Sequence, residues 1–152
     1  MIDTNKSSSA EQQYAGHIIF NKVEKLIGVK LLENPKIYLA DNRYTYIEPD
    51  FYSKDACIIG EIFAHIGKPK KAQDNKIAND ILKMLLIEKV ENKKYRKIIV
   101  VCDEAQKNKL EGLSALAESI RQFGIEIIMI DIPEELRNQI INAQNRQKMI
   151  NA

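Results

Sequence analysis

The chain has 152 residues, of which 45% are hydrophobic and 29% charged, a composition typical of a globular protein of about one domain. The net charge of +2 makes no overall case for nucleic acid or an anionic membrane as a partner, and no apolar run reaches transmembrane length. The two cysteines form no CxxC pair, and no Cys/His cluster has zinc-ligand spacing. The start of the chain lacks the apolar core of a signal peptide, so we expect a cytoplasmic protein with free thiols.

Hydrophobic periodicity predicts a helix followed by three strands in the first half of the chain. Residues 1–10 are polar and serine-rich and are expected to form a flexible arm, and residues 11–152 a single domain. The first helix is predicted to start at a Ser9 cap and to stop at Gly28. Strands are predicted at residues 36–42, 45–52 and 56–67, paired as a meander. The third is apolar on both faces, which indicates a central position in the sheet.

The second half alternates helices with strands. Helices are predicted at residues 72–90, 112–124 and 133–150, and strands at 95–104 and 125–132. Gly124 is expected to end the second of these helices, and Pro133 to open the last. The order predicts an α/β domain in three layers, α/β/α, with a central mixed sheet. Three helices have apolar stripes: Tyr14, Ile18, Ile19, Val23, Leu26 and Ile27; Ile77, Ile81, Leu82 and Leu85; and Leu136, Ile140 and Ala143, with Ile150 as a further candidate.

Two of the predicted strands each carry an acid inside an apolar run. Asp50 follows Pro49 in the second strand, and Glu61 lies in the middle of the third. If these strands pair as a hairpin, the alternation of side chains lets Asp50 and Glu61 converge across neighbouring strands. Two adjacent carboxylates repel and raise each other's pKa, a penalty that a divalent cation removes. Oxygen ligands of this kind suit magnesium.

This stretch resembles the PD-(D/E)XK nuclease superfamily, which has the restriction-endonuclease-like fold. The resemblance rests on a helix, a meander with Pro49-Asp50, a strand bearing Glu61, and a following helix and strand, over residues from about 11 to 102. It implies magnesium, or manganese, held by the two acids and a lysine two positions after the glutamate. The metal and the lysine would then activate water and stabilise the phosphate in the hydrolysis of DNA.

The sequence departs from the family pattern at the lysine. Phe63 stands where the pattern has lysine, and the family resemblance implies that the basic group comes from the following helix instead. Lys76 is the candidate, with Gln73 one turn earlier to orient the site. Asp80 and Lys83 lie on the same helix face at i+4 and i+7 from Lys76.

The resemblance also implies residues that support the site. A first-helix glutamate often joins the metal in this superfamily, and Glu11 is our choice for it. Contacts to the DNA backbone are expected from Lys68, Lys70, Lys71 and Lys83, with an affinity that depends on salt. A homodimer is compatible with the sequence, and no membrane partner is expected.

Other readings of these residues remain open. Asp50 could be a turn acid, Glu61 could pair with Lys76 or Arg43 without a metal, and His65 could be a packed strand-end histidine. Without the family's lysine, the domain could be a nuclease-like module that binds or assembles without catalysis. A third alternative is a small α/β regulatory domain that uses Asp103 and Glu104 at a strand end.

Overall fold

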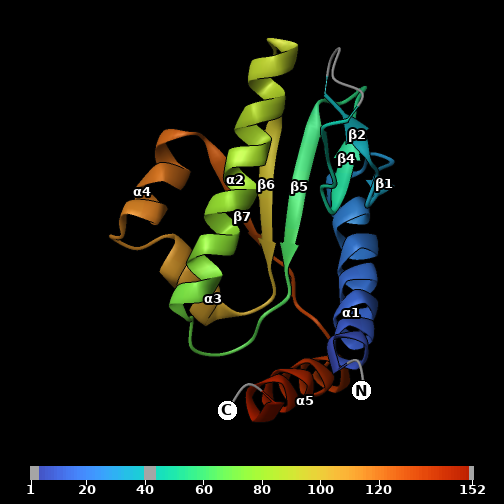
Figure 1. Ribbon diagram of the computed structural model, residues 1–152, viewed down its shortest axis with the longest axis vertical. Coiled ribbons are helices and arrows are strands. Elements are labelled where there is room, and N and C mark those ends of the chain that lie inside the picture. The colour runs from blue at the N-terminus through green and yellow to red at the C-terminus, as the bar shows by residue number, and fades with distance from the viewer. Residues whose placement is uncertain (1–3, 40–43, 151–152) are drawn as a thin grey trace.

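The computed structural model describes residues 4–39 and 44–150. Within this part the chain forms five helices and seven strands (Figure 1). The helices are α1 (Thr4–Ile27), α2 (Lys71–Glu91), α3 (Glu104–Leu110), α4 (Ala115–Gln122) and α5 (Glu134–Ile150). The strands are β1 (Leu32–Glu33), β2 (Ile37–Tyr38), β3 (Tyr46–Ile47), β4 (Phe51–Ser53), β5 (Ile58–Phe63), β6 (Arg96–Val101) and β7 (Ile125–Met129).

A mixed five-stranded sheet organises the molecule. Its order is β1-β4-β5-β6-β7, with β1, β4 and β5 antiparallel and β5, β6 and β7 parallel. Residues of α2, α3 and α4 pack on one face of the sheet and residues of α1 and α5 on the other. The α/β class, the three layers and the central place of β5 are therefore confirmed. No helix in the described ranges is long and apolar enough to cross a membrane.

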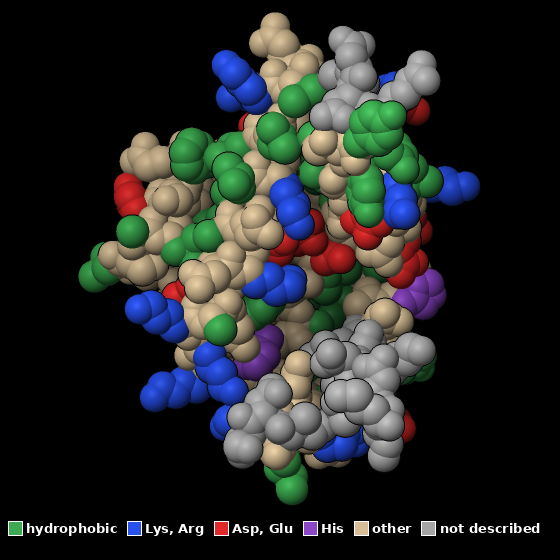
Figure 2. All heavy atoms as spheres, viewed as in Figure 1, with side chains coloured by type: hydrophobic (Ala, Val, Ile, Leu, Met, Phe, Trp, Pro, Cys, Tyr) green, Lys and Arg blue, Asp and Glu red, His purple; other side chains and the backbone are tan. Residues whose placement is uncertain are grey.

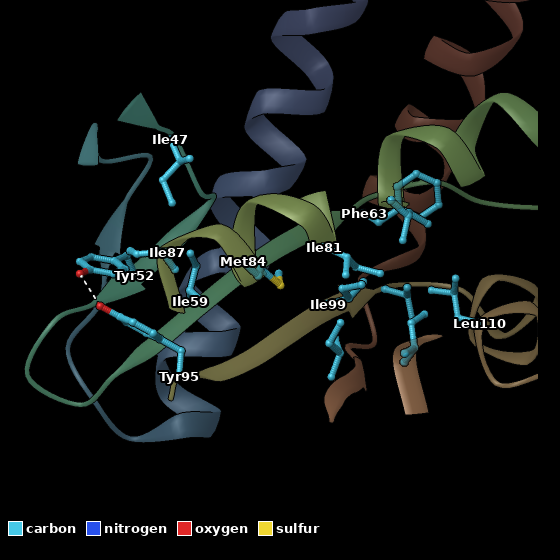
Figure 3. Close-up of a cluster of buried hydrophobic side chains, with 14 of the residues drawn as sticks. Ile47, Tyr52, Ile59, Phe63, Ile81, Met84, Ile87, Tyr95, Ile99 and Leu110 are labelled. Carbon is cyan, nitrogen blue, oxygen red and sulfur yellow. Dashed lines mark hydrogen bonds between the residues drawn. The ribbon is translucent and has the colours of Figure 1, made fainter. Parts of the chain in front are cut away.

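The two faces of the sheet form two hydrophobic cores. On the α2 side, Ile59 and Ile99 from β5 and β6 meet Ile81 and Met84 from α2 (Figure 3). This burial accounts for the near-continuous apolar sequence of β5 and β6, because strands covered on both faces have no polar side. The strand residues that alternate with Ile59 and Ile99 face α1 and α5 on the other side of the sheet: Ile58, Ile98 and Val100.

A glycine in β5 sets the register of the β4–β5 pair. Gly60 lies opposite Phe51, which is fully buried. A Cβ atom at position 60 would lie only 1.9 Å from the Phe51 ring, so any larger side chain would push the ring away. The ring therefore fits only over glycine, and this fit fixes which residues of β4 and β5 are neighbours.

The three-strand meander is wrong in two respects. The predicted strand 45–52 is broken into β3 and β4, which belong to different sheets. The predicted strand 36–42 contributes β2, which pairs only with β3 in a separate two-stranded sheet, while the short β1 takes the place beside β4. Pro49 lies at the break, and proline cannot donate a hydrogen bond to a continuous ladder.

The helix predictions need smaller corrections. Helix α1 already begins at Thr4, so residues 4–10 are helical, and it ends before Gly28, whose φ of +75° suits glycine. Helix α3 was not predicted, because its seven residues are too few to show a periodic stripe. The stripe of α5 is confirmed at Leu136, Ile140 and Ala143. The side chain of Ile150 lies outside the described part of the chain, and Tyr14, Leu26 and Leu82 are exposed. The buried faces of α1 and α2 include other residues that were not assigned to the stripes: Ala15, Phe20 and Met84.

Candidate functional site

A cleft of about 670 Å³ opens beside the end of β5. Its walls come from α1, β1, the segment between β5 and α2, the first turns of α2, and α5. Of the residues that the sequence singled out, Asp50, His65, Lys70, Gln73 and Lys76 line it. Figure 2 shows acidic side chains gathered near the middle of one face of the molecule, with lysines beside them over α2. The cleft therefore brings together groups from both ends of the chain.

Asp50 and Glu61 converge, as the sequence predicts for a hairpin. Phe51 pairs with Gly60, and continuing this antiparallel register places Asp50 opposite Glu61. The Asp50 carboxylate accepts a hydrogen bond from the backbone N–H of Ile62 at 2.6 Å. It is also within hydrogen-bond contact of the Glu61 carboxyl group. The two acids therefore form one hydrogen-bonded pair at the edge of the cleft.

Glu61 is held in an environment that disfavours its charge. Glu61 is only 8% exposed to solvent. Burial is the largest cause that raises the pKa of Glu61 to about 10, followed by the nearby charges of Asp50 and Asp80 and the hydrogen bond with Asp50. Lys76 lowers this pKa but does not outweigh the other causes. Glu61 is therefore protonated at neutral pH and donates its proton to the bond with Asp50.

Asp80 is a third acid of this group, and the sequence analysis did not assign it to the site. It is buried on α2, where burial raises its pKa, Lys76 and Lys83 counteract part of the shift, and the charge of Asp50 adds to it. The Lys76 ammonium donates to Asp80 at 3.4 Å. A signal was present in the sequence, because Asp80 lies between Ile77 and Ile81 on the buried stripe of the helix. An acid on such a stripe needs a polar partner.

Lys76 of α2 lies close to the end of β5. Its ammonium lies 5.9 Å from the centre of the Phe63 ring, and Phe63 is the last residue of that strand. The contact with the ring is weakly favourable. The same ammonium donates to Asp80, and the Lys76 side chain stays 58% exposed.

Gln73 has a structural task in addition to its place in the cleft wall. Its side-chain oxygen accepts a hydrogen bond from the backbone N–H of Lys70 at 3.0 Å, which completes the start of α2. Its amide nitrogen lies 2.8 Å from Nε2 of His65. Burial lowers the pKa of His65, and Lys70 lowers it further, so the ring is neutral at neutral pH. His65 also stacks on Phe63.

The remaining predicted residues that the structure describes do not line the cleft, and of these only Lys83 lies near one of the acids, Asp80. Glu11 forms an ion pair with Arg146 of α5 and does not line the cleft. Lys68 and Lys71 are exposed near the start of α2, and Lys83 is beyond Asp80 on the same helix. Arg43, the alternative partner of Glu61, lies outside the described residues.

Three side chains from the second half of the chain fix the segment between β5 and α2. Gln144 of α5 donates to the carbonyl of Ile66 and accepts from its N–H, both at 2.8 Å. Asp103 accepts from the N–H of Gly67, and Gln106 donates to the Gly67 carbonyl. Asp103 also pairs with Arg137 at 2.7 Å. These contacts give Asp103 a structural role in holding this segment.

The opposite wall of the cleft holds a histidine–glutamate pair that the sequence analysis missed. His17 of α1 lies with Nδ1 2.9 Å from the carboxylate of Glu33 in β1, and both line the cleft. The two residues come from separate elements and carry no local motif, so only the packing of α1 against β1 reveals them.

The donor set fits a hard cation with few protein ligands. In the described part of the chain, no group of three or more His, Cys, Asp or Glu residues could hold a metal ion. Magnesium in proteins is often held by one or two carboxylates, with water and substrate phosphate completing its octahedron. Asp50 lines the cleft and Glu61 lies buried beside it. Magnesium at this place would be held by these two carboxylates, with Glu61 deprotonated.

Comparison with known proteins gave no match. A scan against protein-family models found none, a search of the curated proteins found none, and a search of the solved structures found none.

The protonated state of Glu61 leads to a stability prediction. Its folded-state pKa is about 10 against 4.5 for the ordinary group, so its contribution to stability is complete below pH 4.5 and is lost as the pH rises toward 10. Glutamine keeps the shape and cannot ionise. We expect Glu61→Gln to raise the free energy of unfolding by about 1–3 kcal/mol at pH 7.5, with little change near pH 4.

Urea unfolding at several pH values checks this expectation. Glu48→Gln is the matched control, because Glu48 is exposed and should show no such pH dependence. A loss of stability in Glu61→Gln at pH 7.5 would mean that Glu61 is ionised and held by a cation such as Lys76.

Proposed function

We propose that the chain is a metal-dependent phosphodiesterase that acts on nucleic acid, DNA in the first place, with a site of the PD-(D/E)XK kind. The observation that supports this most is the hydrogen-bonded pair of Asp50 and Glu61 at the edge of a cleft, with the Lys76 ammonium over Phe63 nearby. The two carboxyl groups could not both be ionised here without repelling each other, and a divalent cation in place of the shared proton would remove that penalty.

Each residue has a stated part in this proposal. Asp50 and Glu61 would hold the cation, with Asp50 kept in place by the N–H of Ile62. The Lys76 ammonium would contact a phosphate oxygen and stabilise negative charge on the phosphorus centre. Lys70 and Lys148, which also line the cleft, would attract the neighbouring phosphates. When bound, magnesium would lower the pKa of a coordinated water and neutralise charge on the phosphate.

Calorimetric titration of Mg²⁺ and Mn²⁺ tests the metal site directly. The wild-type protein is expected to bind the ion, and both Asp50→Asn and Glu61→Gln should abolish the binding heat. Because phosphate oxygens complete many magnesium sites, the titrations are repeated with a thymidine dinucleotide present. If both variants bind the ion as the wild type does, the two-carboxylate site is refuted.

A second candidate is a nuclease-like module that binds or assembles without catalysis. Phe63 in place of lysine and the pairing of Lys76 with Asp80 favour it, since the Lys76 ammonium that would contact a phosphate already has a partner. This candidate predicts that the wild type binds neither ion, with or without the dinucleotide, and cleaves no substrate.

A further inference from the structure

A two-stranded sheet with outward-facing tyrosines projects next to the cleft. Strands β2 and β3 pair antiparallel, with Ile37 opposite Ile47 and Tyr38 opposite Tyr46. Ile47 is buried, and both isoleucines pack toward the core on the α2 side of the sheet. Because side chains alternate along a strand, the tyrosine pair faces away from that core. Tyr38 is 54% exposed and Tyr46 is 44% exposed. We call Lys36, Tyr38 and Tyr46 the tyrosine ribbon.

The contacts within the tyrosine ribbon suit a flat, electron-rich ligand with negative charge nearby. The rings of Tyr38 and Tyr46 have centroids 5.5 Å apart and are tilted by 58°. The Lys36 ammonium lies 5.0 Å from the centre of the Tyr46 ring and 3.9 Å from a Glu48 oxygen. Lys36 is therefore placed to meet a phosphate beside a base stacked on the ring.

The ribbon is joined to the cleft at its base, where the chain enters β2 and leaves β3. Glu33 and Asn34, just before β2, line the cleft, and so does Asp50, just after β3. The N–H of Asn34 donates to the carbonyl of Asp50 at 3.0 Å, which closes the base of the ribbon. Tyr46 precedes Asp50 by four residues, so their Cα atoms are at most about 14 Å apart. A strand stacked on the tyrosines is therefore only a few nucleotides from the acids.

We propose that the tyrosine ribbon is a stacking platform for unpaired bases of single-stranded nucleic acid, which it holds while the backbone enters the cleft. The placement of a phosphate at the acids rests on the proposed function, whereas binding to the ribbon does not. Base faces are hidden in a duplex and available in single strands, so an exposed aromatic pair selects the single-stranded form. The ring faces and the lysine beside them set this surface apart from the aliphatic residues exposed on α2, Leu82 and Leu86.

Fluorescence anisotropy with a labelled 15-nucleotide oligothymidylate, in EDTA to prevent cleavage, tests the platform. We expect the double variant Tyr38→Leu/Tyr46→Leu to bind at least tenfold more weakly than the wild type, since each stacked base contributes substantially to affinity. The variant Tyr38→Phe/Tyr46→Phe keeps both rings and should bind nearly as the wild type does. Tyr14→Leu is the matched control, because Tyr14 is an exposed tyrosine on α1.

Two further measurements separate stacking from a general loss of structure. The chain has six tyrosines and no tryptophan, so quenching of its intrinsic emission by the oligonucleotide reports stacking on tyrosine. This quenching should be weaker in the leucine variant and kept in Tyr14→Leu. A duplex of the same length should bind more weakly to the wild type, and the leucine substitutions should not affect its binding.

The outcomes distinguish this proposal from the proposed function. If the leucine variant binds the single strand as the wild type does, or if the wild type does not bind it, the platform is refuted, even where cleavage still requires Asp50. If binding falls as expected while no substrate is cleaved in Mg²⁺, the platform stands and the catalytic proposal fails. If the substitutions change only the sedimentation of the protein, the ribbon is a contact between two copies of the chain, and the platform is refuted.

Discussion

Replacing Asp50 with asparagine is expected to lower the cleavage of DNA in Mg²⁺ by about 10³-fold or more, a loss of about 4 kcal/mol in the stabilisation of the transition state. Asparagine has nearly the same shape, and its side-chain oxygen can still accept the hydrogen bond from the N–H of Ile62. The change therefore removes the negative charge and replaces one of the two acceptor oxygens with an amide donor, while the bond to the backbone is kept. Without that charge, only Glu61 remains of the two carboxylates proposed to hold the cation.

The measurement is cleavage of single-stranded circular DNA and of a supercoiled plasmid, with urea unfolding of each variant alongside. Asp55→Asn is the matched control, since Asp55 is an exposed acid in the turn between β4 and β5 and should have wild-type activity. Cleavage by the wild type that persists in Asp50→Asn would show that the activity comes from another site or from a contaminant.

Breaking the buried ion pair between Lys97 and Glu88 is expected to have the largest effect on stability. The Lys97 ammonium of β6 lies 2.9 Å from the Glu88 carboxylate of α2, and the two side chains are only 6% and 9% exposed. Glu88 also accepts the backbone N–H of Tyr95 at 2.8 Å. We expect Glu88→Ala to lower the free energy of unfolding by about 3–5 kcal/mol, because it leaves a buried ammonium without its partner.

A double-mutant cycle, measured by urea unfolding, separates the interaction energy of Lys97 with Glu88 from the other effects of each substitution. Glu88→Leu combined with Lys97→Met removes both charges and should cost far less than the sum of the two single changes. The exposed pair of Arg96 and Glu126 on β6 and β7 is the matched control. Glu126→Ala should cost less than about 1 kcal/mol, because water screens an exposed pair. A similar small cost for Glu88→Ala would show that water reaches Lys97.

Local sequence was sufficient for the elements whose pattern is strong. The long apolar runs of β5 and β6 indicate strands covered on both faces, and the stripe of Leu136, Ile140 and Ala143 identifies α5. Short elements such as β1 and α3 were missed, because a few residues cannot show a period. Asp50 and Glu61 could be paired from the sequence because a hairpin brings together residues that are close along the chain.

The sequence by itself determined the α/β class and the helix that carries Lys76, and it indicated that Asp50 and Glu61 converge if their strands pair as a hairpin. Only the tertiary structure decided that Asp80 joins these acids, that Lys76 lies over Phe63, and that β2 and β3 leave the main sheet as a separate ribbon. The physical reason is that periodicity reports which side of an element is buried, but not which other element covers it. That choice depends on packing between segments far apart in the chain, as where Phe51 fits over Gly60.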